Sequence, residues 1–332
     1  MKRISTRGKF GLTPARLAAA TLLACSVATP VAASAALASP AEPTDSKAAI
    51  RTYILPGDEV FPEGIAVHGN QYYVTGFGFG EIFRGDLHEP EAEVFTEGSP
   101  DGHGGGIKVT GRRLVEARGS GGVAVYDRIT GALVRKWSNG MSPDETVVND
   151  VAIAPNGDAY LTDSFRPVLY RIPAAALRQP TTVVDDIPVF LEWEGTAFVH
   201  VPGAYNANGV VATPDGKHVL VVNFETGQLV RVRLSDKHVT QVDLGGYTLT
   251  GGDGMVLTEH NDLYVVRFLD SLVAKLRLTD QYRHAQLLSE TTDPSFQGPT
   301  TAAIAGRRLL VVNSQFQGPG TPPFTVSSIP LP

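Results

Sequence analysis

The sequence predicts an all-β fold, a six-bladed β-propeller, and three observations lead to this prediction. A phrase of small or polar residues followed by an alternating apolar run recurs six times within residues 51–332, at intervals of about 42 to 59 residues. Each repeat is long enough for four short strands, which is the content of one propeller blade. The 35 Gly and 23 Pro favour turns over long helices. A β-sandwich, the other all-β candidate, would not explain the repeated phrase.

Each repeat opens with a segment expected to form the innermost strand of a blade, followed by a turn and a second strand. Along the chain these segment pairs are 63–67 with 73–75, 105–107 with 112–115, 149–153 with 159–162, 208–211 with 218–222, 253–256 with 263–266, and 300–304 with 307–312. The turns contain glycine where a tight hairpin needs positive φ, as at Gly157 and Gly216. Two outer strands follow, for example 228–234 and 239–242 in the fourth repeat.

The sixth repeat has room for only three strands before the chain ends at Pro332. We expect residues 51–55 to supply its missing outermost strand. This pairing would close the ring and leave no free sheet edge between the first and last blades.

The N-terminus reads as an export signal. A basic stretch ends at Arg16, and an Ala-rich apolar run follows to Ala38, with small-residue cleavage patterns ending at Ala35 and Ala38. We therefore expect a signal peptide over 1–38, a flexible linker over 39–50 and the propeller over 51–332. A retained membrane anchor is less consistent with the diluted apolar run. Residues 22–25 also resemble a lipobox, in which the signal would end at residue 24 and Cys25 would be lipidated.

Charge and cysteine content exclude several classes of protein. The 28 Lys+Arg include five within residues 1–38, where no acidic residue occurs, so the body is more acidic than the overall net charge of −6. An acidic body argues against nucleic-acid binding. Because Cys25 is the only cysteine, the mature body has no disulfide, no thiol nucleophile and no cysteine-ligated metal. The expected product is secreted, or lipid-anchored to the outer face of the cell membrane, with no membrane span.

The residues that open the six repeats include four oxygen-bearing side chains. Equivalent positions in different blades converge on the propeller axis, and two of these side chains are carboxylates that would repel one another without a cation. Oxygen-only ligands favour Ca²⁺, with Mg²⁺ or Mn²⁺ as alternatives. Any one of these residues alone could be a turn cap, but four at one register indicate a metal site. The six opening residues, called here the lead residues, are Glu63, Gly105, Asn149, Asn208, Asp253 and Thr300.

These segments resemble the gluconolactonase and senescence-marker-protein (regucalcin) family, whose relatives include diisopropyl fluorophosphatase and the paraoxonases. The resemblance covers about residues 51–320 and lies in segments 62–64, 148–150, 208–216 and 253–256. It implies that Glu63, Asn149, Asn208 and Asp253 hold a catalytic Ca²⁺ at the channel mouth. It also implies a metal-dependent hydrolase of a lactone, ester or phosphotriester.

The chemistry also needs a general base, for which Asp253 and His103 are the candidates. His103 lies in the loop entering the second repeat, and its ordinary pKa suits proton transfer near neutral pH. It could equally be a loop histidine bonded to a backbone carbonyl. We expect Asp150 to support its neighbour Asn149 or to cap the strand.

The substrate is expected to be a hydrophobic small molecule. Val147 stands where animal gluconolactonases have a sugar-contacting arginine, so a sugar lactone is disfavoured. Loops on the same face would present several aromatic and two cationic side chains, although each could instead serve packing or an ion pair. These are Phe77, Phe79, Phe165, Arg166, Phe224, Arg267, Phe268 and Phe316.

Two function classes remain after other chemistries are excluded. The sequence has no Gly-x-Ser-x-Gly nucleophile elbow, no P-loop and no His-Glu-x-x-His motif. The first class is an exported, Ca²⁺-dependent hydrolase that acts as a monomer on a small molecule. The second is a non-catalytic propeller whose ion is structural and whose face binds a ligand or a protein partner. Gly105 and Thr300 leave one side of the ion open, which favours the enzyme.

Overall fold

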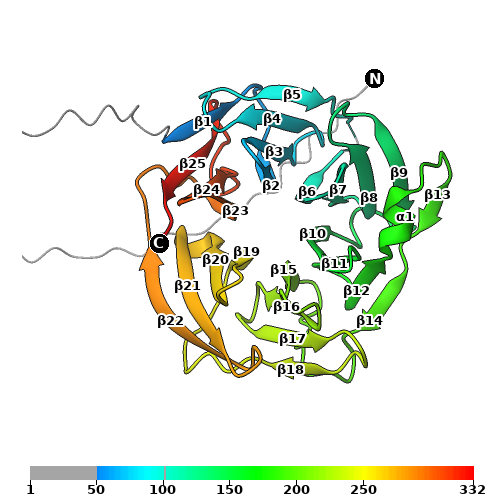
Figure 1. The fold of residues 1–332 in the computed structure, drawn as a ribbon, viewed down its shortest axis with the longest axis vertical. Helices are drawn as coiled ribbons and strands as arrows, with labels where there is room; N and C mark the ends of the chain where they lie inside the picture. Colours follow the sequence, from blue (N-terminus) through cyan, green and yellow to red (C-terminus); the bar gives the residue numbers. More distant parts are fainter. Residues whose placement is uncertain (1–50, 101) are drawn as a thin grey trace, which may run out of the picture. The chain divides into compact units, whose positions relative to one another are not determined.

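The computed structural model describes residues 51–100 and 102–332 and shows six sheets arranged in a ring, each built on four antiparallel strands (Figure 1). The expected signal peptide, linker and lipobox cysteine lie outside the described residues. Blade one contains β2 (Pro62–His68), β3 (Gln71–Gly76), β4 (Ile82–Asp86) and β5 (Glu93–Thr96). Blade two contains β6 (Gly104–Thr110), β7 (Arg113–Arg118), β8 (Gly122–Asp127) and β9 (Leu133–Ser138). Blade three contains β10 (Val148–Ile153), β11 (Ala159–Asp163), β12 (Val168–Ile172) and β14 (Val189–Glu192).

Blades four and five have the same four-stranded plan, and blade six is completed from the other end of the chain. Blade four contains β15 (Ala207–Ala212), β16 (His218–Asn223), β17 (Leu229–Arg233) and β18 (Val239–Gln241). Blade five contains β19 (Gly252–Leu257), β20 (Asp262–Arg267), β21 (Leu272–Thr279) and β22 (His284–Thr291). Blade six contains β23 (Pro299–Ala305), β24 (Arg308–Asn313), β25 (Phe324–Pro330) and β1 (Thr52–Leu55). β1 pairs with β25 in antiparallel register, from Thr52 opposite Ser327 to Leu55 opposite Phe324. The six-bladed ring and its closure are thereby confirmed.

The third repeat contains an insertion that the sequence analysis did not identify. After β12 the chain forms a short helix, α1 (Ala174–Arg178), and then β13 (Val184–Asp186), which pairs in parallel with β9. Blade two therefore has a fifth strand supplied by the chain of blade three. The insertion accounts for the long interval between the third and fourth lead residues. Within the described residues, no helix is long and apolar enough to cross a membrane.

Every innermost strand has a β-bulge at its lead residue. In blade one, Pro62 pairs with Gly76 and Ile65 with Val74, so Glu63 and Gly64 together face Thr75. The same two-against-one interruption recurs in the other five blades, at 105–106, 149–150, 208–209, 253–254 and 300–301. A bulge bends the strand and redirects the side chains at that point. The repeated phrase in the sequence is therefore a repeated backbone feature.

Apolar clusters between adjacent blades hold the ring together. One cluster combines Val115 and Val125 of blade two with Leu161 and Tyr170 of blade three, and five further clusters fill other parts of the ring. Trp137 and Trp193 are fully buried in two of these clusters, which agrees with the packing role expected from their positions.

Candidate functional site

The four oxygen-bearing lead residues open the inner strands β2, β10, β15 and β19, which surround the central channel (Figure 1). The side chains of Glu63, Asn208 and Asp253 are 8%, 4% and 6% exposed, and Asn149 is half-buried. Of the other two lead residues, Gly105 has no side chain. The Thr300 hydroxyl donates to the backbone carbonyl of Glu63 at 3.0 Å, which joins the last blade to the first.

The two carboxylates of this set lie in an environment that disfavours negative charge. Burial raises the pKa of Glu63 well above its ordinary value, and the charges of Asp253 and Asp150 raise it further. Burial also raises the pKa of Asp253, again with a contribution from Asp150. A cation between them would remove the cost of ionising both groups.

Two buried amide oxygens have no hydrogen-bond partner among the described residues. They are Oδ1 of Asn149 and Oδ1 of Asn208. The Asn149 amide nitrogen donates to the Ser164 hydroxyl at 3.1 Å, which leaves its oxygen as the uncommitted end. Buried polar atoms are usually satisfied, and these two oxygens, among ten such side-chain atoms in the described residues, remain free to accept a ligand.

Asp150, directly after the lead residue Asn149, connects blades two, three and four. Its carboxylate accepts the backbone N–H of Val151 at 2.8 Å and of Val210 at 3.1 Å. The Lys108 ammonium lies 3.5 Å from the same carboxylate. Asp150 therefore links the inner strands of three blades next to the lead residue Asn149. With all groups ionised, three carboxylates and one ammonium leave two negative charges, which match a divalent cation.

The donor set is made of two carboxylates and two amides. Among the described residues, no group of three or more His, Cys, Asp and Glu side chains is arranged to hold a metal. A cation here would therefore need the asparagine oxygens as ligands, and both of these oxygens lack a partner among the described residues. Such an oxygen-only set fits Ca²⁺ and excludes a zinc site of the usual His/Cys type.

His103 lies in the loop entering blade two, half-buried beside the channel mouth. Its Nδ1 is 3.0 Å from the backbone oxygen of Phe77. Because a carbonyl oxygen can only accept, Nδ1 carries the proton, and Nε2 of the neutral ring is left able to accept one. The hydrogen bond to a backbone carbonyl that is expected of a structural histidine is therefore present, and it fixes the orientation of the ring.

Aromatic rings form a nearly continuous collar around this end of the channel. Five of the seven rings follow the ends of second strands, which lie beside the lead residues because the two strands are antiparallel, whereas His103 and Tyr205 precede inner strands. Neighbouring ring centroids are 4.8 to 6.5 Å apart in the pairs His103–Phe77, Phe77–Phe316, Phe316–Phe268, Phe268–Phe224, Phe224–Tyr205 and Tyr205–Phe165. We call these seven side chains the aromatic collar. All six blades contribute, and blade two contributes His103.

The aromatic collar contains most of the side chains that the sequence analysis expected at the channel mouth, and three of the expected side chains lie outside it. Phe79 is 40% exposed and instead lines a separate surface cavity with Pro56 and Val94. Arg166 donates to the Tyr170 hydroxyl at 2.7 Å. Arg267 is ion-paired with Asp270 and with Glu290. Both cationic groups are therefore engaged within the protein, and five of the seven collar side chains are phenylalanine.

Sequence reasoning missed Tyr205, Lys108 and Glu116. Tyr205 belongs to the loop before β15, which has no counterpart in the repeated phrase. Lys108 and Glu116 occupy positions that are apolar in the other five repeats, and a register alignment of the six repeats could have found both.

Comparison with known proteins supports the fold. The chain superposes on Mala s 1, the major allergen of Malassezia sympodialis, with a TM-score of 0.63 and 14% identity, covering 84% of this chain and 95% of that chain. Regucalcin from Agrobacterium tumefaciens, described as a calcium-binding protein, gives a TM-score of 0.57 at 15% identity, covering 83% and 94%. A luciferin-regenerating enzyme gives 0.58 at 14% identity, covering 84% and 91%.

No protein-family model matches the chain, and no curated protein sequence matches it. The structural similarities show a six-bladed β-propeller like that of regucalcin and of propeller enzymes. At these identities they establish the architecture, and the function has to be argued from the site.

Proposed function

We propose that this protein is an exported, Ca²⁺-dependent hydrolase of a hydrophobic lactone or ester. The observation that carries the proposal is the convergence of Glu63, Asn149, Asn208 and Asp253 at four equivalent bulges. Their carboxyl groups have raised pKa values, and their amide oxygens lack partners. The similarity to a calcium-binding propeller and to a propeller enzyme supports the same reading. We expect a monomer acting on a small molecule outside the cytoplasm.

Each part of the site has a role in such a reaction. When bound, a divalent cation supplies polarisation of a carbonyl or phosphoryl oxygen as a Lewis acid. The four lead side chains hold the ion, and the sides of Gly105 and Thr300 leave access to it. The aromatic collar binds the apolar part of the substrate and excludes water from the reacting ester.

Proton transfer falls to one of two groups. His103 presents an unprotonated Nε2 at the mouth and could take a proton from the attacking water. Asp253 is the alternative base, but it is also one of the ion's proposed ligands. We favour His103, because its ring is oriented by a backbone carbonyl and it is not needed to hold the ion.

The side chains at the channel mouth restrict the class of substrate that the site could bind. Arg166 and Arg267 are engaged with protein groups, so the mouth offers no evident partner for a sugar acid. Val147 likewise replaces a sugar-contacting arginine. A neutral substrate with an aromatic or aliphatic ring therefore fits better than a sugar lactone.

The test is metal analysis of the purified protein, combined with a lactone and aryl-ester hydrolysis screen before and after chelation. We expect one equivalent of Ca²⁺, activity that is lost on chelation, and recovery when Ca²⁺ is restored. A bound ion without turnover on any substrate would favour the ligand-binding propeller. An ion-free protein that stays ion-free in Ca²⁺ would show that the four residues do not form a metal site.

A further inference from the structure

Beyond the candidate metal centre, the channel contains a cavity of about 420 Å³. Its walls come from all six inner strands, at positions two to four residues after each lead residue. These positions lie further along the strands, toward the end of the channel opposite the aromatic collar. A ligand could enter here without passing the four lead residues, so its binding can be measured separately from any hydrolysis.

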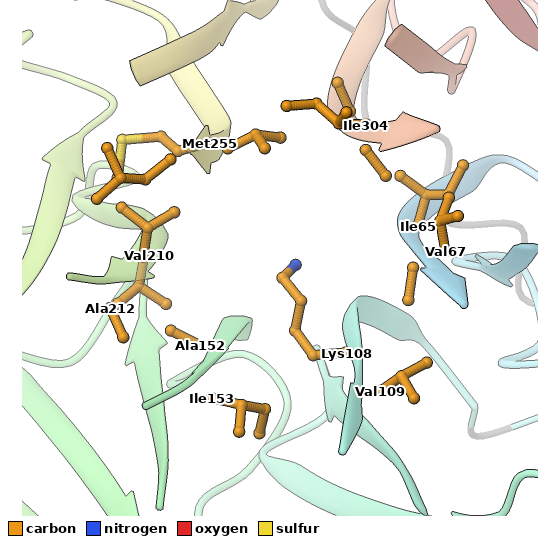
Figure 2. A pocket seen from close by; sticks show the side chains of 16 residues that line it. Ile65, Val67, Lys108, Val109, Ala152, Ile153, Val210, Ala212, Met255 and Ile304 are labelled. Atoms are coloured by element: carbon orange, nitrogen blue, oxygen red, sulfur yellow. The ribbon is translucent and has the colours of Figure 1, made fainter. Parts of the chain in front are cut away.

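The lining of this cavity is aliphatic with one exception. The ring formed by the third residue after each lead residue consists of Ala66, Lys108, Ala152, Val211, Val256 and Ala303. Small side chains at the five other positions keep the bore open. Figure 2 shows Lys108 extending from the wall toward the middle of the cavity, among side chains such as Ile65, Val210, Met255 and Ile304. The cavity thus combines an apolar wall with a single cationic group.

The Lys108 ammonium is only partly satisfied by the protein. Its one polar contact among the described residues is with Oδ1 of Asp150, at the long distance of 3.5 Å. That carboxylate already accepts two backbone N–H groups. An ammonium has three donors, so donors remain for a ligand in the cavity.

We propose that this cavity binds an unbranched aliphatic monocarboxylate, with its tail along the aliphatic walls and its carboxylate on Lys108. Burial of the apolar tail against the aliphatic walls provides affinity. The carboxylate supplies the charge-assisted hydrogen bonds that Lys108 lacks. Asp150 lies beside the ammonium and would repel a second negative charge, so a phosphate monoester fits less well. The volume lies within the range of about 300–1,000 Å³ that is typical of small-molecule sites.

Calorimetric titration with dodecanoate and dodecan-1-ol, both below their aggregation limits, tests the proposal. The wild-type protein is expected to bind one equivalent of dodecanoate at least about tenfold more tightly than the alcohol, the usual effect of a hydrogen bond to a charged group. Lys108→Met should abolish this preference while leaving alcohol binding intact. Lys275→Met is the matched control, because Lys275 pairs with Asp262 on an outer strand, and it should retain the preference.

Two further variants locate the bound tail. Ala303→Phe fills the bore and should remove binding of both ligands, whereas Phe268→Ala in the aromatic collar should leave binding unchanged. Thermal unfolding establishes that each variant is folded, and Lys108→Met serves as the decisive variant if Ala303→Phe does not fold. Equal affinity for acid and alcohol in the wild type, tighter binding of dodecyl phosphate, or sensitivity to Phe268→Ala would each overturn the proposal.

Discussion

Blade two shares the four-stranded plan of the other blades but differs from them at several positions that face the channel or its mouth. Its lead residue is Gly105, where four other blades have a carboxylate or amide side chain. Lys108 belongs to a ring of channel-facing residues that are otherwise Ala or Val. Directly after its second strand, blade two has Gly119, which lies next to His103, whereas blades one, four and five have Phe77, Phe224 and Phe268 at the equivalent position. Blade two thus repeats the backbone plan of the other blades but carries Lys108 and Glu116 at register positions that are apolar in the other five.

The difference extends into the blade-two core. Glu116 is fully buried and pairs with Ile107, at a register position held by Val74, Leu161, Val221, Val265 and Val311 in the other blades. One carboxylate oxygen accepts the Tyr126 hydroxyl at 3.2 Å, and the other has no partner among the described residues. The Arg118 guanidinium is 3.6 Å away. Burial raises the pKa of Glu116 to about 7.

The largest expected effect comes from removing a ligand contributed by a blade other than blade two. Asp253→Ala should abolish Ca²⁺ binding and lower kcat/KM by about 10³-fold, because the charge that develops in the transition state loses its stabilisation. Calcium titration and hydrolysis assays measure both quantities. Asp236→Ala changes an exposed ion-paired aspartate and is the matched control. A collapse of thermal stability in Asp253→Ala, with no hydrolysis in the wild type to lose, would instead identify the ion as structural.

The next effect concerns the imidazole of blade two. His103→Gln should lower kcat by about 10²-fold, because proton transfer loses its base. Calcium affinity should stay unchanged, since His103 is not among the proposed ligands. Full activity of the variant would leave Asp253 as the base.

The buried Glu116 predicts how stability depends on pH. Its pKa in the folded protein is about 7, above the ordinary value of 4.5, so the folded state binds more protons than the unfolded state between these values. Stability should therefore fall as pH rises from about 4.5 through 7, by up to about 3 kcal/mol. Denaturant unfolding at pH 5 and pH 8 measures this change. Glu116→Gln should remove that part of the pH dependence, and an unchanged dependence would assign it to other groups.

The smallest effect is expected in the aromatic collar. Phe268→Ala should raise KM for a hydrophobic ester by about threefold to tenfold, because one ring contact is lost while its neighbours remain. Phe79→Ala removes an exposed phenylalanine outside the collar and should leave KM unchanged. Equal effects of the two substitutions would mean that the collar does not contact the substrate.

The sequence allowed the number of blades, the lead register and the closing strand to be predicted. The blades and their register depend on strand alternation, turn glycines and spacing within one repeat. The closing strand followed from the room for only three strands in the last repeat, although its pairing joins the two ends of the propeller. The same register predicted Glu63, Asn149, Asn208 and Asp253 as a group, because residues at equivalent positions of successive blades are placed around one axis. The insertion that places α1 and β13 against blade two breaks the repeat, and it was missed for that reason.

The tertiary structure decided how these residues act on one another. Thr300 bonds to the Glu63 carbonyl across 237 residues of sequence, a contact that exists only after the ring closes. The orphaned amide oxygens, the Lys108–Asp150 pair and the aromatic collar likewise depend on side chains from different blades meeting at the axis. Sequence by itself determined which residue stands at each register position. Burial and proximity, which set the pKa values and leave donors unpaired, arise only from packing six blades around one channel.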